Sequence, residues 1–309
     1  MTVADWCLRP GRIVLLAISG TSLLLSGCSS ANVRGSLSTS STTNAPTTTT
    51  APEEPGWTTL SVGPHGIAID EKVFTEADGT PVTVARFLHG HVNYSLHIGS
   101  QDPPSGGATL GPESGSAVSA AERPLLLACF NGGFKVADGV GGTESNGTVL
   151  VPLKIGEASL VLDRGGDAQL GVWGSTVPAA GETAASVRQN LPPLVVDGQP
   201  SPDVATWQDW GITLGRVPRV PRSALGEDAK GDLLYAAAPS SLPVDMATAL
   251  VGAGATTGME LDINYSNVQF DTAATPGAPL TARISGQLRP ADQCQVGWVR
   301  DFVTVLATG

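Results

Sequence analysis

The sequence predicts a mixed α/β (α+β) fold, in which twisted sheets and hairpins dominate and a few helices pack against them. Of the 309 residues, 38 are Gly and 23 are Pro, and only 15% are charged. Such a turn-rich composition is typical of β-rich proteins and not of helical bundles. Short apolar runs separated by turn signals recur along the chain, which favours strands and hairpins.

The first 28 residues have the pattern of a bacterial lipoprotein signal peptide. Arg9 and Arg12 give a positive start, and the apolar residues 13–25 are too few for a comfortable transmembrane helix. The stretch ends in Leu-Ser-Gly-Cys, which resembles a lipobox whose Cys28 thiol takes the lipid. An ordinary secretory signal with a chance cysteine is the alternative. We expect a lipid anchor on the extracytoplasmic face of the cell membrane.

Residues 29–56 are rich in Ser, Thr, Ala and Pro, cannot bury a core, and are expected to be a disordered tether. Residues 57–309 are expected to form a single domain. The net charge of -11 disfavours nucleic acid as a partner, so a phosphate group would have to meet a local cluster of arginines.

Export also affects the cysteines. Cys7 would leave with the signal peptide and Cys28 would be acylated, so Cys129 and Cys294 remain in an oxidising compartment. A disulfide between them is one reading, and two unpaired buried thiols are the other, because the sequence does not give their separation.

The elements of the domain follow from apolar runs and turn residues. Gly-containing turns mark three hairpins, and apolar residues at helical spacing mark one helix. A second, short helix is predicted at residues 116–122. The hairpins span residues 66–88, 158–173 and 222–238; further strands are expected at 94–98, 125–130, 194–196, 259–264 and 296–306, and the main helix at 243–255.

The strand at residues 259–264 alternates strictly between apolar and polar side chains. Because it follows the predicted main helix, we expect an inner position in a sheet, with the apolar face covered. The polar face is either a wetted edge or the floor of an active site. It carries Glu260, Asp262 and Asn264.

The buried strand at 125–130 runs directly into Asn131, Gly132 and Gly133. Paired glycines allow a positive φ and let a ligand approach bare backbone N–H groups. The amide of Asn131 can donate and accept. A plain tight turn is the simpler interpretation of the two glycines.

Three further side chains stand out. Arg222 closes a run of arginines spaced three apart, and Arg188 lies among hydrogen-bonding neighbours; a guanidinium suits phosphate or carboxylate. Alternatively, the arginines of this run pair with acidic residues on the protein surface. His97, at a strand end, is either an acid, base or ligand-binding group or a packing residue. The motifs of zinc proteases, serine hydrolases, P-loop NTPases and Cys-x-x-Cys redox proteins are absent.

Several stretches together resemble the phosphodiester glycosidase family. The resembling pieces follow the order of the family's motifs, between about residues 125 and 262. The chain departs from the pattern where Ile263 and Asn264 replace glycines, so the strand is expected to continue there. This form is similar to that of exported actinobacterial relatives, which share pieces at residues 96–103 and 300–302. The pieces are Asn-Gly-Gly-Phe at 131–134, Pro-Arg-Ser-Ala-Leu-Gly at 221–226, and Leu-Asp at 261–262.

The resemblance implies hydrolysis of a sugar joined through its anomeric carbon to a phosphodiester. Because the phosphate leaving group is a weak base, the chemistry needs a cation for the phosphate and a carboxylate for the anomeric carbon or for water. Arg222 is predicted to hold the phosphate with Arg188 second, and Asp262 and Glu260 are the catalytic carboxylates. The predicted substrate-binding residues are Asn131, Gly132, Gly133, Arg188, Asn264 and His97.

No cofactor is required for this reaction. Asp262 and Asn264 offer hard oxygen ligands of the kind that Ca²⁺ or Mg²⁺ prefers. The expected partners are glycosyl-phosphate carbohydrates of the cell envelope, with the membrane reached only through the lipid. A non-catalytic lipoprotein that binds wall polysaccharide is the alternative function.

Overall fold

A computed structural model of the chain describes residues 54–105, 114–211 and 213–309. In this part strand makes up 41% and helix 12%, so the fold is more strongly β than the mixed α/β class that the sequence predicts. The predicted signal peptide, Cys28 and nearly all of the predicted tether lie outside the described residues. Within them no helix is long and apolar enough to cross a membrane.

The largest sheet has eight strands, paired antiparallel throughout. Two of the three predicted hairpins lie in it. The strand predicted at residues 259–264 takes an inner position, as expected, but it begins at Ala255 and ends at Glu260. In spatial order the strands are β1 (Thr58–Gly63), β2 (Gly66–Thr75), β3 (Pro81–Phe87), β14 (Leu233–Ser241), β13 (Val220–Asp228), β15 (Ala255–Glu260), β11 (Val195–Val196) and β12 (Gln199–Pro200).

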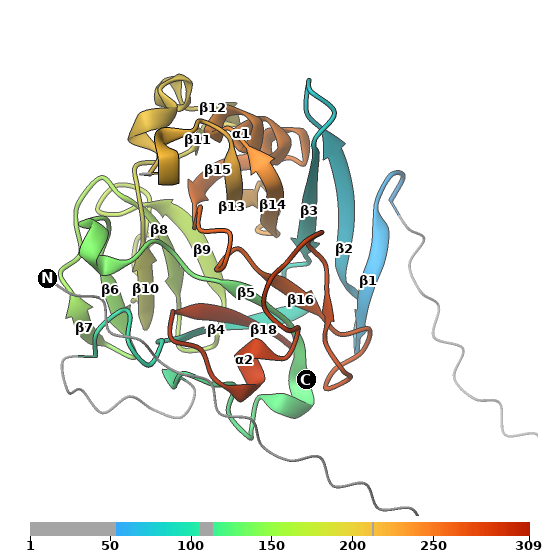
Figure 1. Cartoon of the computed structure of the whole chain (residues 1–309). Coiled ribbons are helices and arrows are strands. Elements are labelled where there is room, and N and C mark those ends of the chain that lie inside the picture. Colours follow the sequence, from blue (N-terminus) through green and yellow to red (C-terminus); the bar gives the residue numbers. More distant parts are fainter. Residues whose placement is uncertain (1–53, 106–113, 212) are drawn as a thin grey trace, which may run out of the picture. The chain divides into compact units, whose positions relative to one another are not determined.

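Two antiparallel sheets of five strands complete the β structure (Figure 1). The first contains the remaining predicted hairpin: β7 (Thr148–Val151), β6 (Thr143–Ser145), β10 (Ser186–Gln189), β8 (Ala158–Leu162) and β9 (Ala168–Val172). The second contains β17 (Thr281–Ala282), β16 (Phe270–Thr272), β5 (Leu126–Asn131), β18 (Phe302–Ala307) and β4 (Val92–His97).

The main predicted helix is confirmed as α1 (Pro243–Gly252). Pro243 suits the first helical turn, where a backbone N–H has no partner, and Asp245 accepts the Leu242 N–H. The helix predicted at residues 116–122 is wrong, since this stretch forms bends and turns. The strand predicted at residues 296–306 is confirmed only in its second half, as β18 (Phe302–Ala307), because α2 (Gln293–Val296) ends where the prediction begins. Within the described residues, short 3₁₀ turns span Arg123–Leu125, Val136–Asp138, Pro202–Ala205, Trp207–Asp209 and Leu214–Arg216.

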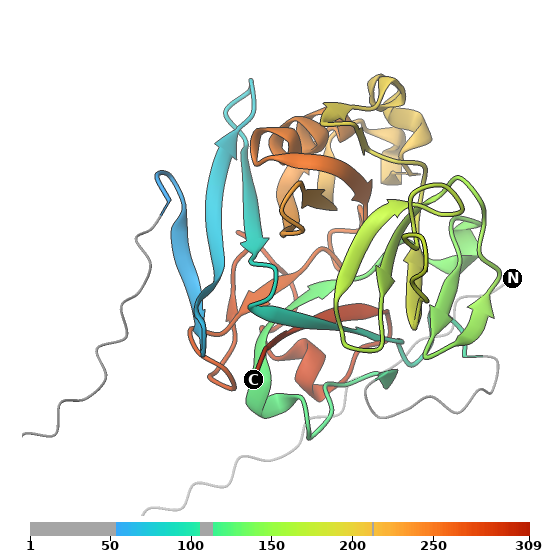
Figure 2. The same cartoon turned by 180° about the vertical axis from the view of Figure 1, so that it is seen from behind.

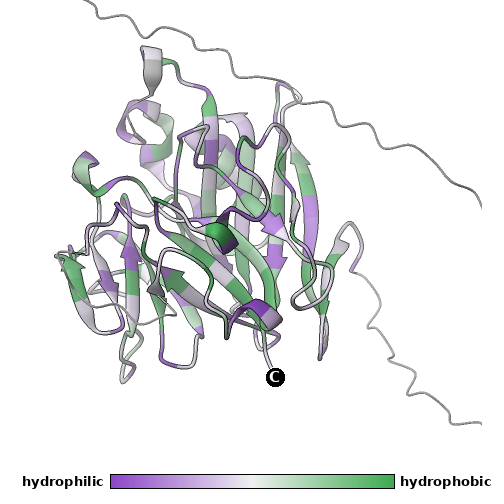
Figure 3. Cartoon of the chain, turned by 60° about the horizontal axis from the view of Figure 1, so that its bottom comes forward, coloured by the Kyte–Doolittle hydropathy of each residue, from purple (hydrophilic) through white to green (hydrophobic). Residues whose placement is uncertain are grey.

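The apolar side chains form two main layers. The inner faces of all three sheets share one core, which includes Phe87, Phe130 and Met259; Figure 2 shows the same sheets from behind. The opposite face of the eight-stranded sheet packs on α1, through residues such as Leu234 and Leu250. Colour bands in Figure 3 alternate along the strands, as expected for sheets whose two faces meet different surroundings.

The disulfide between Cys129 and Cys294 is present, with Cα atoms 6.6 Å apart. It joins β5 to α2 inside an apolar cluster with Trp298 and Phe302. Because the bridge closes a loop of 165 residues, it removes much conformational freedom from the unfolded chain.

Replacing both cysteines by alanine is therefore expected to lower the free energy of unfolding by about 2–5 kcal/mol, measured by urea denaturation. Reductant should bring the wild type to the same value and leave the double variant unchanged. A loss below about 1 kcal/mol would contradict a stabilising role for the bridge.

Candidate functional site

Asp262 lies two residues beyond the end of β15, the strand on which the site is built. Leu261 N donates to Ser223 O on β13 at 2.8 Å, and Ser223 N donates to Asp262 O at 2.9 Å, so the pairing lasts just beyond β15. The chain then turns because the Asp262 carboxylate accepts from Asn264 N at 2.8 Å, and the Asn264 side chain accepts from Ser266 N at 2.9 Å. Two successive Asx turns thus replace the predicted continuation of the strand.

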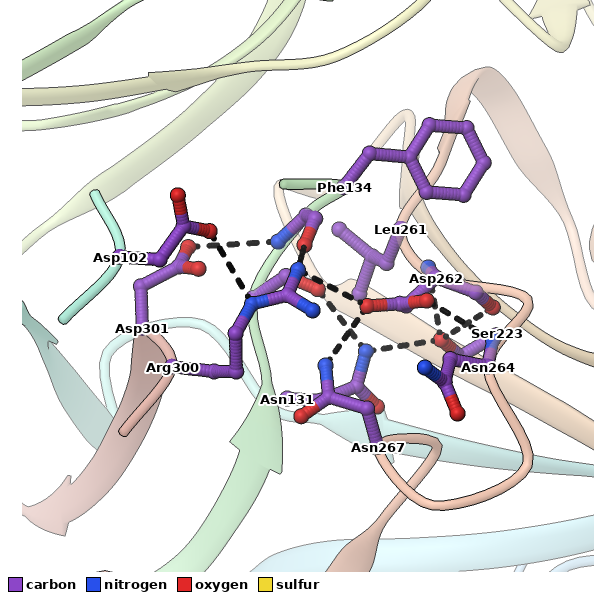
Figure 4. Close-up of polar contacts among 12 residues, drawn as sticks. Asp102, Asn131, Phe134, Ser223, Leu261, Asp262, Asn264, Asn267, Arg300 and Asp301 are labelled. Atoms are coloured by element: carbon purple, nitrogen blue, oxygen red, sulfur yellow. Dashed lines mark hydrogen bonds and ion pairs between the residues drawn. The ribbon is translucent and has the colours of Figure 1, made fainter. Parts of the chain in front are cut away.

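The Asp262 carboxylate is 2% exposed and held by three donors (Figure 4). Besides Asn264 N, they are Asn267 Nδ2 at 2.6 Å and Arg300 Nη2 at 3.1 Å. Burial raises the pKa of Asp262, while the charge of Arg300 opposes part of that rise. The group is a fixed carboxylate facing a fixed cation.

Arg300 lies between two carboxylates from distant parts of the sequence (Figure 4). Its Nη2 also donates to Gly133 O at 2.6 Å, and its Nε lies 3.1 Å from Asp102 Oδ2. Asp102 in turn accepts from Val136 N at 3.1 Å. The guanidinium is therefore held rigidly beside Asp262. Sequence reasoning assigned no role to Arg300, although it marked residues 300–302 as part of the resemblance.

The neighbouring Asp301 forms a buried ion pair beneath the two glycines. Its Oδ2 accepts from Arg188 Nε at 2.7 Å and from Gly133 N at 3.3 Å, and its carbonyl accepts from Gly132 N at 2.9 Å. A Cβ on Gly132 would lie 1.9 Å from Asp301 Oδ2, and one on Gly133 2.9 Å from the Arg188 guanidinium. The glycines are needed for close approach to this ion pair and not, as predicted, for positive φ or for bare amides that face a ligand.

Arg188 lies inside the protein, since its two amino groups donate to Gln189 O and Phe134 O, each at 2.6 Å. Asn131 is also fully buried: its amide donates to Gly132 O and Ser223 Oγ at 2.9 Å, and its carbonyl accepts from Tyr235 and from the backbone. Arg188 is 2% exposed and Asn131 0%. Their predicted ligand-binding roles find no support in this arrangement.

Arg222 and Glu260 form a second buried ion pair, with neither side chain exposed by more than 1%. Arg222 also donates to Ser241 O and Trp210 O, both at 3.0 Å. Burial raises the pKa of Glu260 to about 7. The pair lies outside the lining of every described pocket, so Arg222 is not placed to hold a phosphate and Glu260 is not placed to meet a substrate.

His97 lies apart from these groups. Its ring stacks on Phe302 with centroids 4.5 Å apart, and its nitrogens contact Glu122 Oε1 at 3.0 Å and Gly115 O at 2.8 Å. The side chain is fully buried. This is the packing alternative that the sequence left open.

A pocket of about 670 Å³ opens over Asp262. Its polar lining includes Asp262, Asn264, Arg300 and the exposed Lys135, together with Asp138, Gln208, Asp209, Thr213 and Ser266. Its apolar lining, which we call the apolar wall, contains Phe134, Val140, Leu191, Val220, Pro221, Ile263 and Tyr265. Of the predicted site residues, the structure therefore brings Asp262 and Asn264 to this pocket, and it adds Arg300 and Lys135, which sequence reasoning missed.

Asp262 and Asn264, the pair predicted to bind a divalent cation, already accept hydrogen bonds from the protein. Both Asp262 oxygens accept hydrogen bonds, Asn264 Oδ1 accepts from Ser266, and a guanidinium nitrogen lies 3.1 Å from Asp262. The described residues contain no cluster of three or more His, Cys, Asp or Glu that could hold a metal. These side chains, as arranged, are a poor fit for Ca²⁺ or Mg²⁺, and we route no step through a metal.

No protein-family model matches the chain, and no curated protein matches it. Among solved structures, the catalytic domain of zebrafish N-acetylglucosamine-1-phosphodiester α-N-acetylglucosaminidase, auto-inhibited by its pro-peptide, is similar with a TM-score of 0.51. The identity is 15%, over 82% of this chain and 88% of that one. A hypothetical protein from Synechocystis gives a TM-score of 0.50 at 12% identity, over 83% and 64% of the two chains. The likeness is one of fold.

The contact between Gly132 and Asp301 gives a direct test of the site's support. Gly132→Ala places a Cβ 1.9 Å from Asp301 Oδ2, and we expect the free energy of unfolding to fall by about 3 kcal/mol or more. Gly63→Ala is the matched control, because its Cβ would meet nothing nearer than 3.6 Å. Equal urea midpoints for the two variants would contradict this account.

Proposed function

We propose that the chain is an exported, lipid-anchored hydrolase that cleaves a sugar from a phosphodiester, in a glycosyl-1-phosphate linkage of the cell envelope. The observation that carries this proposal is the fixed pair of Asp262 and Arg300, 3.1 Å apart at the floor of the 670 Å³ pocket. The fold similarity to the catalytic domain of the zebrafish enzyme supports it.

In this reaction a carboxylate acts at the anomeric carbon and a cation acts at the leaving phosphate, the two ends of the bond that breaks. Asp262 would stabilise positive charge at the anomeric carbon or orient the attacking water. Arg300 would meet negative charge on the leaving phosphate, as a guanidinium aimed in advance by Gly133 O and Asp102. The phosphate is a weak base, so the pocket has little need of a strong general acid.

The apolar wall gives the sugar ring a place to lie. Phe134 and Ile263 present carbon surfaces, and Tyr265 is 56% exposed. Aromatic and aliphatic side chains opposite a few fixed polar groups are typical of small-molecule sites. The sugar would lie against this wall, with its anomeric carbon toward Asp262.

The location follows from the N-terminal sequence. The Cys28 lipid would hold the domain at the extracytoplasmic membrane face, and a tether over residues 29–56 would let it reach envelope glycans. The acidic chain disfavours polyanionic nucleic acid as a partner.

The second candidate is a non-catalytic lipoprotein that binds wall polysaccharide in the same pocket. One observation favours it: both oxygens of Asp262 already accept hydrogen bonds from the protein. A carboxylate held in this way has less capacity left for water or for a developing cation.

Hydrolysis separates the two candidates. The substrate is N-acetylglucosamine 1-(nitrophenyl phosphate), with the released nitrophenyl phosphate detected through added phosphatase. We expect turnover by the wild type and a loss of about 100-fold or more in kcat/KM in Asp262→Asn and in Arg300→Gln. Lys230→Gln, an exposed charge change on the β13–β14 turn, is the control. Glycan binding without turnover of any glycosyl phosphodiester would favour the binding protein.

The pH dependence tests the role of the carboxylate. Since the ionised form acts, kcat/KM should rise with pH through the pKa of Asp262, which burial places above the ordinary value of 3.8. Arg300 lowers that pKa, so Arg300→Gln should move the acid limb of the residual activity to higher pH. Lys230→Gln should leave the limb in place. If the acid limb of the kcat/KM profile stays in place or moves to lower pH in Arg300→Gln, Asp262 is not the titrating group.

A further inference from the structure

A second hollow, of about 330 Å³, adjoins the large pocket. The two share Lys135, Asn264, Ser266 and Arg300, so a ligand can extend from one into the other. We call the second one the cationic hollow. Its remaining lining is Gln101, Asp102, Asn267, Arg289 and Val299.

The cationic hollow presents hydrogen-bond donors that the protein does not use. Arg289 donates through Nε to Ser266 O at 2.6 Å and lies over the Trp298 ring, 5.8 Å from its centroid. These contacts fix its plane and leave its two terminal amino groups without a partner among the described residues. Likewise, no described hydrogen bond or ion pair involves the ammonium group of Lys135, and Arg300 Nη1 makes no described contact.

The charges of the hollow do not balance. Lys135, Arg289 and Arg300 supply three positive charges, whereas Asp102 in the lining and Asp262 beside Arg300 supply two negative charges. In a chain with a net charge of -11, this local excess of positive charge points to an anionic ligand, because no carboxylate among the described residues pairs with Lys135 or Arg289.

Asn267 supplies an independent observation. Its Nδ2 donates to Asp262 Oδ2 at 2.6 Å, which fixes the orientation of the amide. Its Oδ1 is then buried without a hydrogen-bond partner, in a residue only 2% exposed. A buried carbonyl without a donor is costly, so a ligand group that carries a hydroxyl would complete it.

We propose that the cationic hollow is a phosphoryl subsite for a phosphate ester with a hydroxyl group close to its phosphate, of the kind found in polyol and sugar phosphates. Phosphate suits it better than carboxylate, because three cationic side chains offer more donors than two oxygens accept. The assignment rests on the proposed function: the sugar that leaves lies in the large pocket, the phosphate ester lies in the cationic hollow, and Asp262 and Arg300 lie where they join.

Binding to the complete chain, measured by isothermal titration calorimetry, tests the subsite without turnover. The probes are glycerol 1-phosphate, inorganic phosphate and acetate. We expect glycerol 1-phosphate to bind most tightly and acetate least, with an affinity that falls as salt is added. Lys135→Gln and Arg289→Gln should each weaken the binding of glycerol 1-phosphate by roughly tenfold or more. Lys230→Gln, which removes the same charge elsewhere, should not.

Each result decides the matter. Unchanged affinity in both variants, or no binding of glycerol 1-phosphate by the wild type at millimolar concentration, would overturn the subsite. If inorganic phosphate binds more tightly than glycerol 1-phosphate, the proposed contact between a ligand hydroxyl and Asn267 is wrong. If both variants weaken binding but the wild type turns over no glycosyl phosphodiester, the subsite stands and the proposed hydrolase activity is wrong. If the wild type turns over a glycosyl phosphodiester and neither variant changes the rate, the hydrolase activity stands and the subsite is wrong.

Discussion

The ion pair between Arg188 and Asp301 is the contact on which the site depends. It is almost fully buried, since the side chains are 2% and 0% exposed, and it lies directly beneath Gly132 and Gly133. Asp301 precedes β18 and fixes the backbone there, so the adjacent Arg300 is aimed at Asp262. A buried ion pair adds little net stability, because desolvation offsets the attraction, but removing one partner is costly. The pair therefore serves to fix geometry.

Arg222 and Glu260 repeat this arrangement under the other half of the site. Their ion pair is fully enclosed and ties the end of β15 to β13. Two residues later the chain presents Asp262 to the pocket. In both places a charge that the protein encloses and neutralises lies within two positions of a charge that the pocket can use. Rigid support of this kind keeps Asp262 and Arg300 in one geometry before a ligand arrives.

Local patterns could be predicted from the sequence, whereas the partners of the charged groups could not. The hairpins, α1 and the position of Asp262 follow from periodicity and turn residues close together in the chain. Arg222 and Arg188 were chosen because guanidinium suits phosphate, but it equally suits buried carbonyls and carboxylates. Burial by strands far away in the sequence decides whether an arginine binds a ligand or pairs inside the protein. The role of Arg300 arises because its segment lies beside Gly133 and Asp262, 167 and 38 residues away in sequence.

Ile263 has a structural role of its own. Gly211 adopts a φ of +99°, and a Cβ there would lie 2.5 Å from Ile263 Cδ1 and 2.9 Å from the Phe134 ring. The loop around Gly211 therefore comes close enough to pack on Ile263 and Phe134. Ile263 thus belongs to the apolar wall, while two Asx turns and Arg300 hold Asp262 through separate contacts. The apolar and the charged parts of the pocket are therefore supported independently of each other.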